Sequence, residues 1–366
     1  MGDDAEILAG GDIDKDKLSE KGVYPVIANA LTNDGIVGYY EDEFRINAPA
    51  VTVTGRGDVG HAQARVVNFT PVVRLLSVKS NHDAYFLENA IHMHRVIVES
   101  TGVPQLTTPQ LSNYKIWFTS IDEEKKIGAL FTNLDRLITL HQREHDKTVN
   151  IKKAMLEKMF PKDGEDKPEI RLAGFTDPWE QRKLGDIAEF SKGYGYAKGD
   201  LRETGTPVIL YGRLYTKFET VISQVDTFAC VYENTVFSKG GEVIVPASGE
   251  TAEDISRASV VENAGIILGG DLNVIKPEPT IDPVFLAVTI SNGTQQKELS
   301  KRAQGKSVVH IHNSDLRAVM LVYPQLDEQK QIRDLFLHFD ALIALHQREL
   351  NKLQNMKKAL LEKMFV

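Results

Sequence analysis

The sequence predicts an α+β protein with two β-rich domains, each followed by a long helix, the two helices packing as an antiparallel coiled coil with pseudo-twofold symmetry. Residues 121–161 recur at 326–366 with a constant offset of 205, and more than half of the aligned positions are identical. Shorter matches in the same order precede both copies. Two copies this far apart indicate a duplicated half-molecule and not a solenoid.

The first domain is predicted to span residues 1–120 and the second residues 184–325. Short β-rich runs in both are separated by Gly, Asn and Asp, which is typical of strands joined by tight turns. These runs are residues 50–54, 64–69, 72–78, 243–246 and 265–268. Helical spacing follows at 83–99 and at 283–302. Pro25-Val26-Ile27 matches Pro207-Val208-Ile209, so the duplication includes the domains themselves.

The two repeats, residues 121–161 and 326–366, are predicted to be long helices. Ser120 and Glu123 have the spacing of a capping box, and Pro161 ends the first helix. Apolar residues recur in steps of three and four, which indicates a heptad seam. The seam includes Phe131, Leu134, Ile138 and His141 in the first copy and Phe336, Phe339, Ile343 and His346 in the second. A helix of this length, roughly 57 Å, exceeds what one small domain covers, so we expect the two to pack together.

Polar residues occupy equivalent positions of the seam. His141 matches His346, and Lys152 matches Lys357. Polar residues at such positions cost stability but can fix register and partner. Alternatively, long polar side chains extend from the seam to solvent. The sequence leaves both interpretations open.

Composition restricts the class of protein. Cys230 is the only cysteine, so no intrachain disulfide forms, and without a signal peptide or a long uncharged apolar run we expect a cytoplasmic protein. The net charge is −8, but it is unevenly placed: residues 1–43 hold 3 Lys/Arg against 11 Asp/Glu, and residues 44–120 hold 7 against 4. Local positive fields of this kind can attract a polyanion whatever the total charge. Residues 162–183 are predicted to be a linker and a lead-in to the second domain.

Several motifs suggest chemistry that their context does not favour. Residues 55–60 read G-x-G-x-x-G, but too few residues follow for the helix of a dinucleotide site, and a loop that redirects the backbone, toward a phosphate for example, is the better interpretation. Residues 141–145 read H-x-x-E-H, yet the second copy replaces the last histidine by Leu350. The pairs His92 with His94 and His310 with His312 lack further ligands nearby in sequence. We therefore expect no metal and no catalytic residue in this chain.

The whole chain resembles one known family. A variable β-rich domain is followed by a helix ending in Lys-Lys-Ala-x-Leu-Glu-Lys-Met-Phe, then by Gly174-Phe175-x-x-x-Trp179-Glu180-Gln181-Arg182-Lys183-Leu184-Gly185-Asp186, a second variable domain and a second helix. This order resembles the specificity subunit (HsdS-like) of Type I restriction-modification enzymes. The first copy departs from the family pattern, because Met1 aligns with Leu184 and residues 170–183 have no counterpart before it.

The resemblance implies a non-catalytic subunit with two target-recognition domains, each reading one half of a split DNA site. It also implies that the paired helices set the distance between the domains and bind two methylation subunits, which restriction subunits then join. The expected cofactors, S-adenosylmethionine, ATP and Mg, would belong to those partners and not to this chain. An alternative is a coiled-coil adaptor that binds only proteins. A less favoured one is a stand-alone nuclease or methyltransferase.

DNA contact requires Arg for guanine, Asn or Gln for adenine, Ser or Thr for either, and Lys or hydroxyl groups for phosphates. Loops that contact DNA should therefore combine these residue types with glycine. The candidates in the first domain are Arg56, Gln63, Arg65, Thr101 and Gln105. Those in the second domain are Tyr194, Tyr196, Arg213, Tyr215, Ser248, Lys301, Arg302, Gln304, Lys306, Ser307 and His310.

Overall fold

The computed structural model describes residues 1–94, 102–303 and 308–365. It forms two compact units, unit 1 with Met1–Glu144 and His346–Val366, and unit 2 with His145–Leu345. Each unit contains one β-rich domain and a part of both long helices, α3 (Ile121–Lys158) and α8 (Leu326–Met364). The predicted division in chain order stays a prediction, because the units cut across both helices.

Unit 1 contains an antiparallel sheet of four strands in the order β1-β7-β4-β5. These strands are β1 (Ala5–Ala9), β7 (Leu75–Ser80), β4 (Ala50–Thr54) and β5 (Ala62–Arg65). A smaller sheet joins β3 (Ile36–Tyr40), β2 (Tyr24–Ile27) and β6 (Thr70–Pro71). The run at 50–54 is confirmed. The strand predicted at 64–69 ends earlier because Val66 and Val67 are exposed, and the one at 72–78 begins later because Arg74 has a φ of 76°.

Unit 2 contains two sheets of five strands. The first has the order β12-β17-β15-β19-β9: Val221–Ile222, Ser259–Val261, Glu242–Pro246, Leu272–Pro277 and Ala188–Lys192. The second has the order β10-β13-β11-β18-β14: Leu201–Arg202, Phe228–Ala229, Thr206–Ile209, Ala264–Leu268 and Phe237–Lys239. Two short pairs complete the unit: β16 (Ser248–Gly249) with β20 (Val309–His310), and β21 (Met320–Tyr323) with β8 (Glu180–Lys183).

Strand register confirms that the domains are copies. Ala5 lies opposite Ser80 in unit 1, and Ala188 lies opposite Pro277 in unit 2, at offsets of 183 and 197. The parallel pairing of β2 with β6 likewise recurs as β11 with β18. A one-residue slip would turn every side chain to the other face of the sheet, so matching register means matching cores.

An aspartate cap connects each sheet to a long helix. Asp83 accepts hydrogen bonds from the first turn of α1 (Ala84–His92), and Asp282 does the same for α5 (Pro283–Ile290). The backbone N–H of Asp83 donates to Glu124 of α3, while that of Asp282 donates to Gln329 of α8, at 3.2 and 2.8 Å. Glu124 and Gln329 are fully buried, so these bonds orient each domain on its helix.

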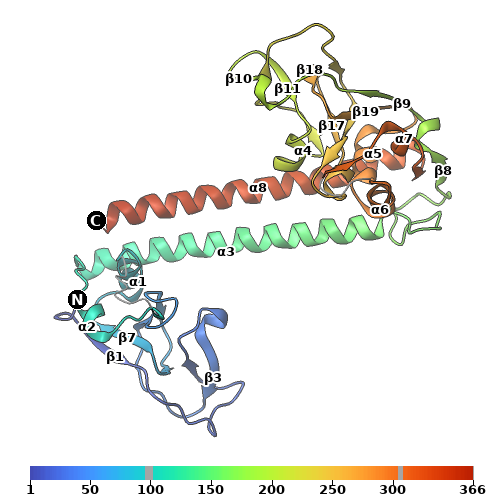
Figure 1. Ribbon diagram of the computed structural model, residues 1–366. Coiled ribbons are helices and arrows are strands. Elements are labelled where there is room, and N and C mark those ends of the chain that lie inside the picture. The colour runs from blue at the N-terminus through green and yellow to red at the C-terminus, as the bar shows by residue number, and fades with distance from the viewer. Residues whose placement is uncertain (95–101, 304–307, 366) are drawn as a thin grey trace. The chain divides into compact units, whose positions relative to one another are not determined.

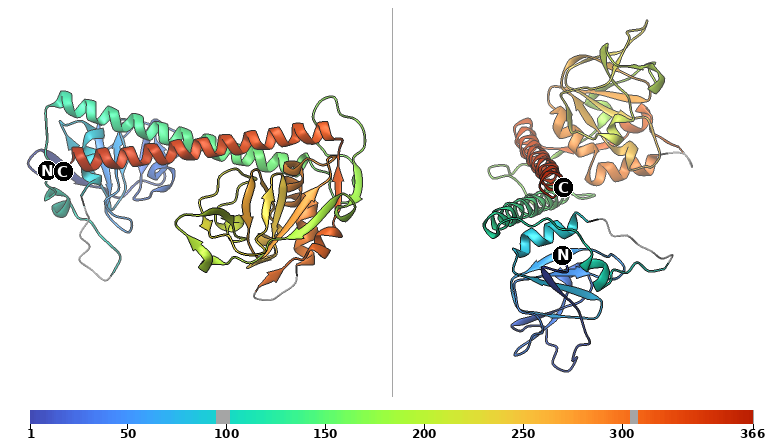
Figure 2. Two further views of the ribbon diagram at one scale, coloured as in Figure 1. Left: turned by 90° about the horizontal axis from the view of Figure 1, so that it is seen from above. Right: turned by 90° about the vertical axis from the view of Figure 1, so that its left-hand side faces the viewer.

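The long helices pack together through the predicted seam. In unit 1, Phe131 and Leu134 of α3 are buried in one cluster with Phe86 of α1 and with Leu353 and Leu360 of α8. In unit 2, Phe336 of α8 packs on Phe160, which follows α3, and on Phe339. Ile138 and Ile343 are half-buried. The first part of α3 therefore packs on the last part of α8, and the last part of α3 packs on the first part of α8. The two helices are antiparallel (Figures 1 and 2).

The polar seam residues contact the opposite helix. Lys357 bonds Asp135 in unit 1, and Lys152 bonds Asp340 in unit 2, so one ion pair occurs twice at matching positions. Within unit 1, the Nδ1 atoms of His141 and His346 lie 3.2 Å apart. Contacts of this kind require a fixed register, and they favour that interpretation over side chains extended into solvent. The Ser120 capping box is half formed, because the Glu123 carboxylate bonds Thr119 and not the Ser120 backbone.

We predict that Gly128→Ala destabilises unit 1 although alanine is the better helix former. A Cβ at position 128 would lie 2.3 Å from the Asp83 carboxylate and 3.1 Å from the Phe86 nitrogen. The expected cost is about 1–3 kcal/mol in the free energy of urea-induced unfolding, as for other overpacked sites. Thr139→Ala, on the exposed surface of α3, is the matched control and should stay within about 0.5 kcal/mol. Equal stability of both variants would contradict the cap-to-helix contact.

A second prediction concerns the Lys357–Asp135 pair. Asp135→Lys places two lysines opposite each other and should lower the free energy of unfolding by about 1 kcal/mol, whereas the exchange Asp135→Lys with Lys357→Asp should recover most of it. Because both side chains are partly exposed, the loss should shrink in about 1 M salt. Additive effects of the two substitutions would show that the pair does not join the helices.

Candidate nucleic-acid interface

A glycine-rich loop in unit 1 holds Arg56 beside Gln105. The two residues form an antiparallel β-bridge. Asn29 fixes the loop, because its Nδ2 donates to the Arg56 carbonyl at 2.8 Å and its Oδ1 accepts the Gly55 N–H at 2.7 Å. Gly57, at a φ of 76°, donates its N–H to the Pro104 carbonyl at 2.9 Å. Within the described part of the chain, the guanidinium of Arg56 and the amide of Gln105 make no hydrogen bond, so both are available to a ligand.

Arg74 lies next to this loop and is not among the candidates predicted from the sequence. The Gly55 N–H donates to the Arg74 carbonyl at 3.0 Å, and a Cβ on Gly55 would lie 2.4 Å from that oxygen. In unit 1 a side chain at position 55 would therefore collide with this carbonyl, and glycine avoids that collision. Arg74 is exposed. The available signal was weak, a basic residue in a turn before a strand, because its position depends on a contact between distant segments.

Gln63 and Arg65 lie on β5 and bind the segment that follows β2. The guanidinium of Arg65 donates to the Thr52 hydroxyl at 3.0 Å and to the Asp34 carbonyl at 2.9 Å, and burial lowers the pKa of Arg65. The amide of Gln63 lies 3.3 Å from the Asp34 carboxylate. Arg65 thus has an internal role, while Gln63 is held less firmly. The structure gathers Arg56, Gln63 and Arg65 around one loop, since Asn29 and Asp34 belong to it.

Unit 2 repeats the same backbone site with other side chains. Ser248 pairs with His310, just as Arg56 pairs with Gln105, at offsets of 192 and 205. The Ala247 N–H donates to the Asp271 carbonyl at 2.8 Å, as Gly55 does to Arg74. Asp271 also has a positive φ of 58°. We call these two sets the loop platforms: Arg56, Arg74 and Gln105 in unit 1, and Ser248, Asp271 and His310 in unit 2.

The side chains of the unit 2 platform are more constrained than those of unit 1. Ser248 is buried, and its hydroxyl lies 3.2 Å from the Asp271 carboxylate. Asp271 and His310 are exposed. The ring of His310 is parallel to that of His312, with centroids 6.5 Å apart. The groups that this platform offers to a ligand are therefore a carboxylate and an imidazole.

Three predicted contacts of the second domain are instead internal. Arg213 is 9% exposed and forms ion pairs with Glu219 and Asp226 at 2.7 and 2.6 Å. Hydrogen bonds from Lys217 and Arg213 lower the pKa of Asp226 to about 2. Tyr196 is 6% exposed and bonds the Cys230 carbonyl at 3.0 Å.

The Tyr215 hydroxyl bonds the Ser248 carbonyl, and burial raises the pKa of Tyr215. The polar groups of Tyr196, Arg213 and Tyr215, which were candidates for DNA contact, are therefore bonded within unit 2 in this structure. A basic or aromatic side chain looks the same in sequence whether it binds a ligand or fills an interior. Tyr194, by contrast, is 57% exposed.

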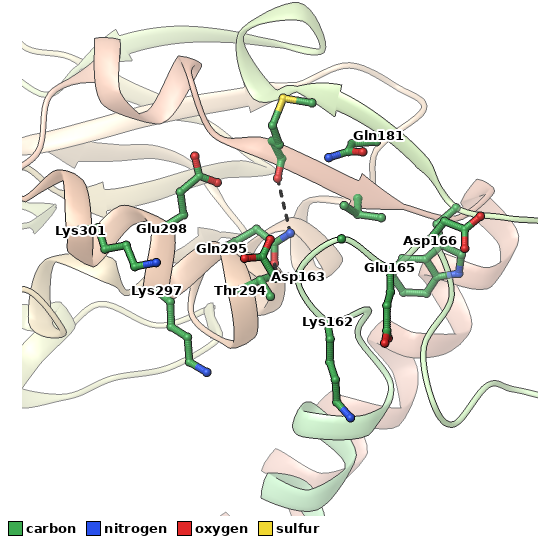
Figure 3. A pocket seen from close by; sticks show the side chains of 14 residues that line it. Lys162, Asp163, Glu165, Asp166, Gln181, Thr294, Gln295, Lys297, Glu298 and Lys301 are labelled. Atoms are coloured by element: carbon green, nitrogen blue, oxygen red, sulfur yellow. Dashed lines mark hydrogen bonds between the residues drawn. The ribbon is translucent and has the colours of Figure 1, made fainter.

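Of the five candidates between residues 301 and 307, Lys301 and Arg302 lie in the described part of the chain. Lys301 lies on α6 (Gly293–Arg302) and, with Lys297 and Lys162, lines a cavity of about 480 Å³ (Figure 3). The same cavity contains Asp163, Glu165, Asp166 and Glu298, so its charge is mixed. Arg302 pairs with Glu298 at 2.8 Å. The candidates Gln304, Lys306 and Ser307, and Thr101 of the first domain, lie outside the described residues.

The motifs that suggested metal chemistry lie in other settings. His141 of the H-x-x-E-H sequence contacts His346 across the helix seam. His92 accepts the Ala62 N–H at Nε2, which requires that nitrogen to be unprotonated. In residues 1–94, 102–303 and 308–365, no three His, Cys, Asp or Glu side chains gather as metal ligands. Within the same ranges, every helix is too short or too polar to cross a membrane.

Comparisons with known proteins agree with this architecture. The family model for the Type I restriction modification DNA specificity domain matches residues 1–149 and 176–355. The chain is 21% identical to the Type I restriction enzyme MjaVIII specificity subunit of Methanocaldococcus jannaschii, over 93% of this chain and 85% of that protein.

Two solved structures are similar in fold. One is the Type-I restriction-modification S subunit from M. genitalium, with a TM-score of 0.61 and 14% identity over 100% of this chain and 94% of that one. The other, from a study of complex assembly in a type I R-M system, has a TM-score of 0.50 and 16% identity, over 98% and 97% of the two chains. Because the family model matches both repeated domains and most of the paired helices, the chain belongs to the DNA specificity subunits of Type I restriction-modification systems.

Proposed function

We propose that this chain reads the two halves of a split DNA site, one with each loop platform. The observation that carries the proposal is the recurrence of one backbone site with different side chains: Arg56 and Gln105 in unit 1 occupy the places of Ser248 and His310 in unit 2. A shared backbone presents each set of side chains in a similar way. Divergent side chains on it then select different bases.

The two platforms differ in the charge of their side chains. Arg56 and Arg74 suit guanine or phosphate oxygens, and Gln105 suits adenine, whose N6 and N7 match a side-chain amide. Asp271 suits the N4 amino group of cytosine, from which a carboxylate can accept. The two half-sites should therefore differ in sequence. Of the two platforms, the one in unit 1 should attract phosphates more strongly, because the unit 2 platform has no lysine or arginine.

We further propose that α3 and α8 bind two methylation subunits and separate the two readers, with restriction subunits joining that complex in the cytoplasm. A helix of 38 residues spans about 57 Å, which bounds the distance between half-sites at about 17 base pairs. The chain itself would perform no catalysis. S-adenosylmethionine, ATP and Mg would be bound by the partners. The matched ion pairs of the seam support this role, since they hold the two helices in one register.

Removing Arg56 and Arg74 together should weaken DNA binding. If both contact phosphates, the slope of log affinity against log salt should fall by about two; if Arg56 reads a guanine, changing that base should cost the native chain about 1–3 kcal/mol and the variant nothing. A filter-binding titration of the complex with its methylation subunits measures both. Arg136→Ala, an exposed charge on α3, is the matched control. Unchanged affinity and slope in the double variant would count against the unit 1 platform.

Asp271→Asn should alter recognition of one half-site only. The substitution keeps the size of the side chain but adds an amide donor, which changes the preferred base from cytosine toward adenine. Methylome sequencing of host cells carrying either chain should show one half of the motif changed and the other half kept. Loss of the gene should remove the motif altogether. A change in both halves, or a motif that persists without the gene, would contradict separate reading by the two units. A stable chain that never binds DNA would indicate the adaptor role.

A further inference from the structure

Each loop platform includes a turn against which a second segment of the chain packs. The turns are residues 71–75 in unit 1 and 268–272 in unit 2. Gly10 donates its N–H to the carbonyl of the last residue of the first turn at 2.8 Å, and Gly193 does the same in the second turn at 3.0 Å. A Cβ on these glycines would lie 2.0 and 1.9 Å from a carbonyl oxygen of the turn. The segments that contain the two glycines therefore lie in the same place beside each platform.

The next residue of each segment is Gly11 in unit 1 and Tyr194 in unit 2. The Gly11 N–H donates to the Pro71 carbonyl at 3.1 Å, and the Tyr194 N–H donates to the Leu268 carbonyl at 3.0 Å. Donors and acceptors are related by the offsets of the strand register, 183 and 197. One backbone position thus has no side chain in unit 1 and a tyrosine in unit 2.

The guanidinium of Arg45 fills the space that Gly11 leaves open. A Cβ on Gly11 would lie 2.5 Å from Nη1 of Arg45, and Nη2 of Arg45 donates to the Asp12 carbonyl. Arg45 is exposed, and among the described residues it forms no ion pair. It belongs to another segment of the chain, so an alignment of the two copies does not match it with Tyr194. Only the contact with Gly11 shows that the two side chains hold equivalent places.

Both side chains lie next to a platform residue. The residue before Arg74 donates its N–H to the Gly11 carbonyl at 3.0 Å. The residue before Asp271 donates its N–H to the carbonyl of Gly195, which follows Tyr194, at 2.9 Å. Tyr194 is 57% exposed, and within the described part of the chain its hydroxyl makes no hydrogen bond. A ligand bound at either platform can therefore reach the group beside it.

An arginine and a tyrosine in equivalent places have one chemical ability in common. Both donate hydrogen bonds to phosphate oxygens. They do not select the same base, because a guanidinium matches O6 and N7 of guanine and a phenol offers no such pair of donors. Phosphates recur along DNA whatever its sequence, so a phosphate is the partner that two different half-sites can both supply.

We propose that Arg45 and Tyr194 contact equivalent phosphates, one in each half-site, beside the bases that the loop platforms read. The inference rests on the proposed function, because it adds a contact to each platform. Arg45 forms a charged contact that releases counterions from DNA, whereas Tyr194 forms a neutral one. Unit 1 therefore binds its half-site with a stronger salt dependence than unit 2.

Single substitutions separate the charged contact from the neutral one. In the complex with the methylation subunits, Arg45→Ala should weaken DNA binding by about tenfold and lower the slope of log affinity against log salt by about one. Tyr194→Phe removes only a hydroxyl, so it should weaken binding by about fivefold and leave the slope unchanged. Lys21→Ala, an exposed cation ahead of β2, and Tyr232→Phe, another exposed tyrosine of unit 2, are the matched controls. Both should stay within about twofold of the native chain.

A transplant tests whether the two side chains hold equivalent places. Apart from the adjacent residues of the chain, only the Arg45 guanidinium lies within 4 Å of a Cβ at position 11 among the described residues. Gly11→Tyr combined with Arg45→Ala should therefore regain about fivefold in affinity while the salt slope stays lowered. Gly11→Phe combined with Arg45→Ala has the ring without the hydroxyl and should regain nothing.

Uncharged methylphosphonates, placed one at a time in the DNA, locate the two phosphates. One replacement should weaken binding by the native chain but not by Arg45→Ala. A second replacement, in the other half-site, should have the same relation to Tyr194→Phe. Because neither residue reads a base, methylome sequencing of cells carrying either variant should show the native motif.

The inference is overturned if Arg45→Ala leaves the salt slope unchanged, if both phosphates lie in one half-site, or if Gly11→Phe regains as much affinity as Gly11→Tyr. A changed motif in either variant also overturns it, because the residue would then read a base. In each of these cases, removal of Arg56 and Arg74 still weakens DNA binding if the proposed function is correct. Normal DNA binding by that double variant as well would mean that the proposed function fails with this inference.

Discussion

The pairing of α3 with α8 is the interaction on which the rest of the molecule depends. A long helix with one apolar stripe gains little stability in water until a partner covers that stripe. Phe131 and Leu134 in unit 1, and Phe336 in unit 2, are buried at that interface. The Asp–Lys pairs restrict it to one register, because a shift by one turn would leave half-buried charges without partners. The caps of α1 and α5 bond α3 and α8, so each domain is tied to a helix whose register these pairs fix.

Each domain is attached to its long helix by the same backbone contact, but the side chain that accepts it is a glutamate in unit 1 and a glutamine in unit 2. An aspartate caps the helix that follows the sheet, and a buried side chain of a long helix accepts the N–H of that aspartate. Unit 1 uses Glu124, which also bonds His82, and leaves room with Gly128; unit 2 uses Gln329 and adds Arg333, which bonds Asp282 at 2.8 Å. The same hydrogen bond thus forms with a charged or a neutral acceptor, because the backbone geometry is the same in both units.

In the loop platforms the backbone contacts are kept and the side chains differ. Their backbone contacts are the same in both units, while the side-chain groups change from two guanidiniums and an amide to a hydroxyl, a carboxylate and an imidazole. A rigid backbone with variable side chains is an efficient way to alter recognition, because new base preferences need no new fold. The platforms thus differ between the units, whereas more than half of the aligned positions of the long helices are identical. Under the proposed function, the platforms would meet different bases and the two helices would offer similar surfaces to the partners.

The sequence by itself determined the duplication, the two long helices, their seam and the family, because each rests on periodicity or on identity between the two copies. It also located Arg56 and Gln105 and, by register, Ser248 and His310. Only the tertiary structure brought Arg74 and Asp271 to the platforms, buried Tyr196 and Arg213, and placed the guanidinium of Arg45 against Gly11. Those outcomes depend on which distant segments touch, and a side chain's type and spacing along the chain carry no record of such contacts.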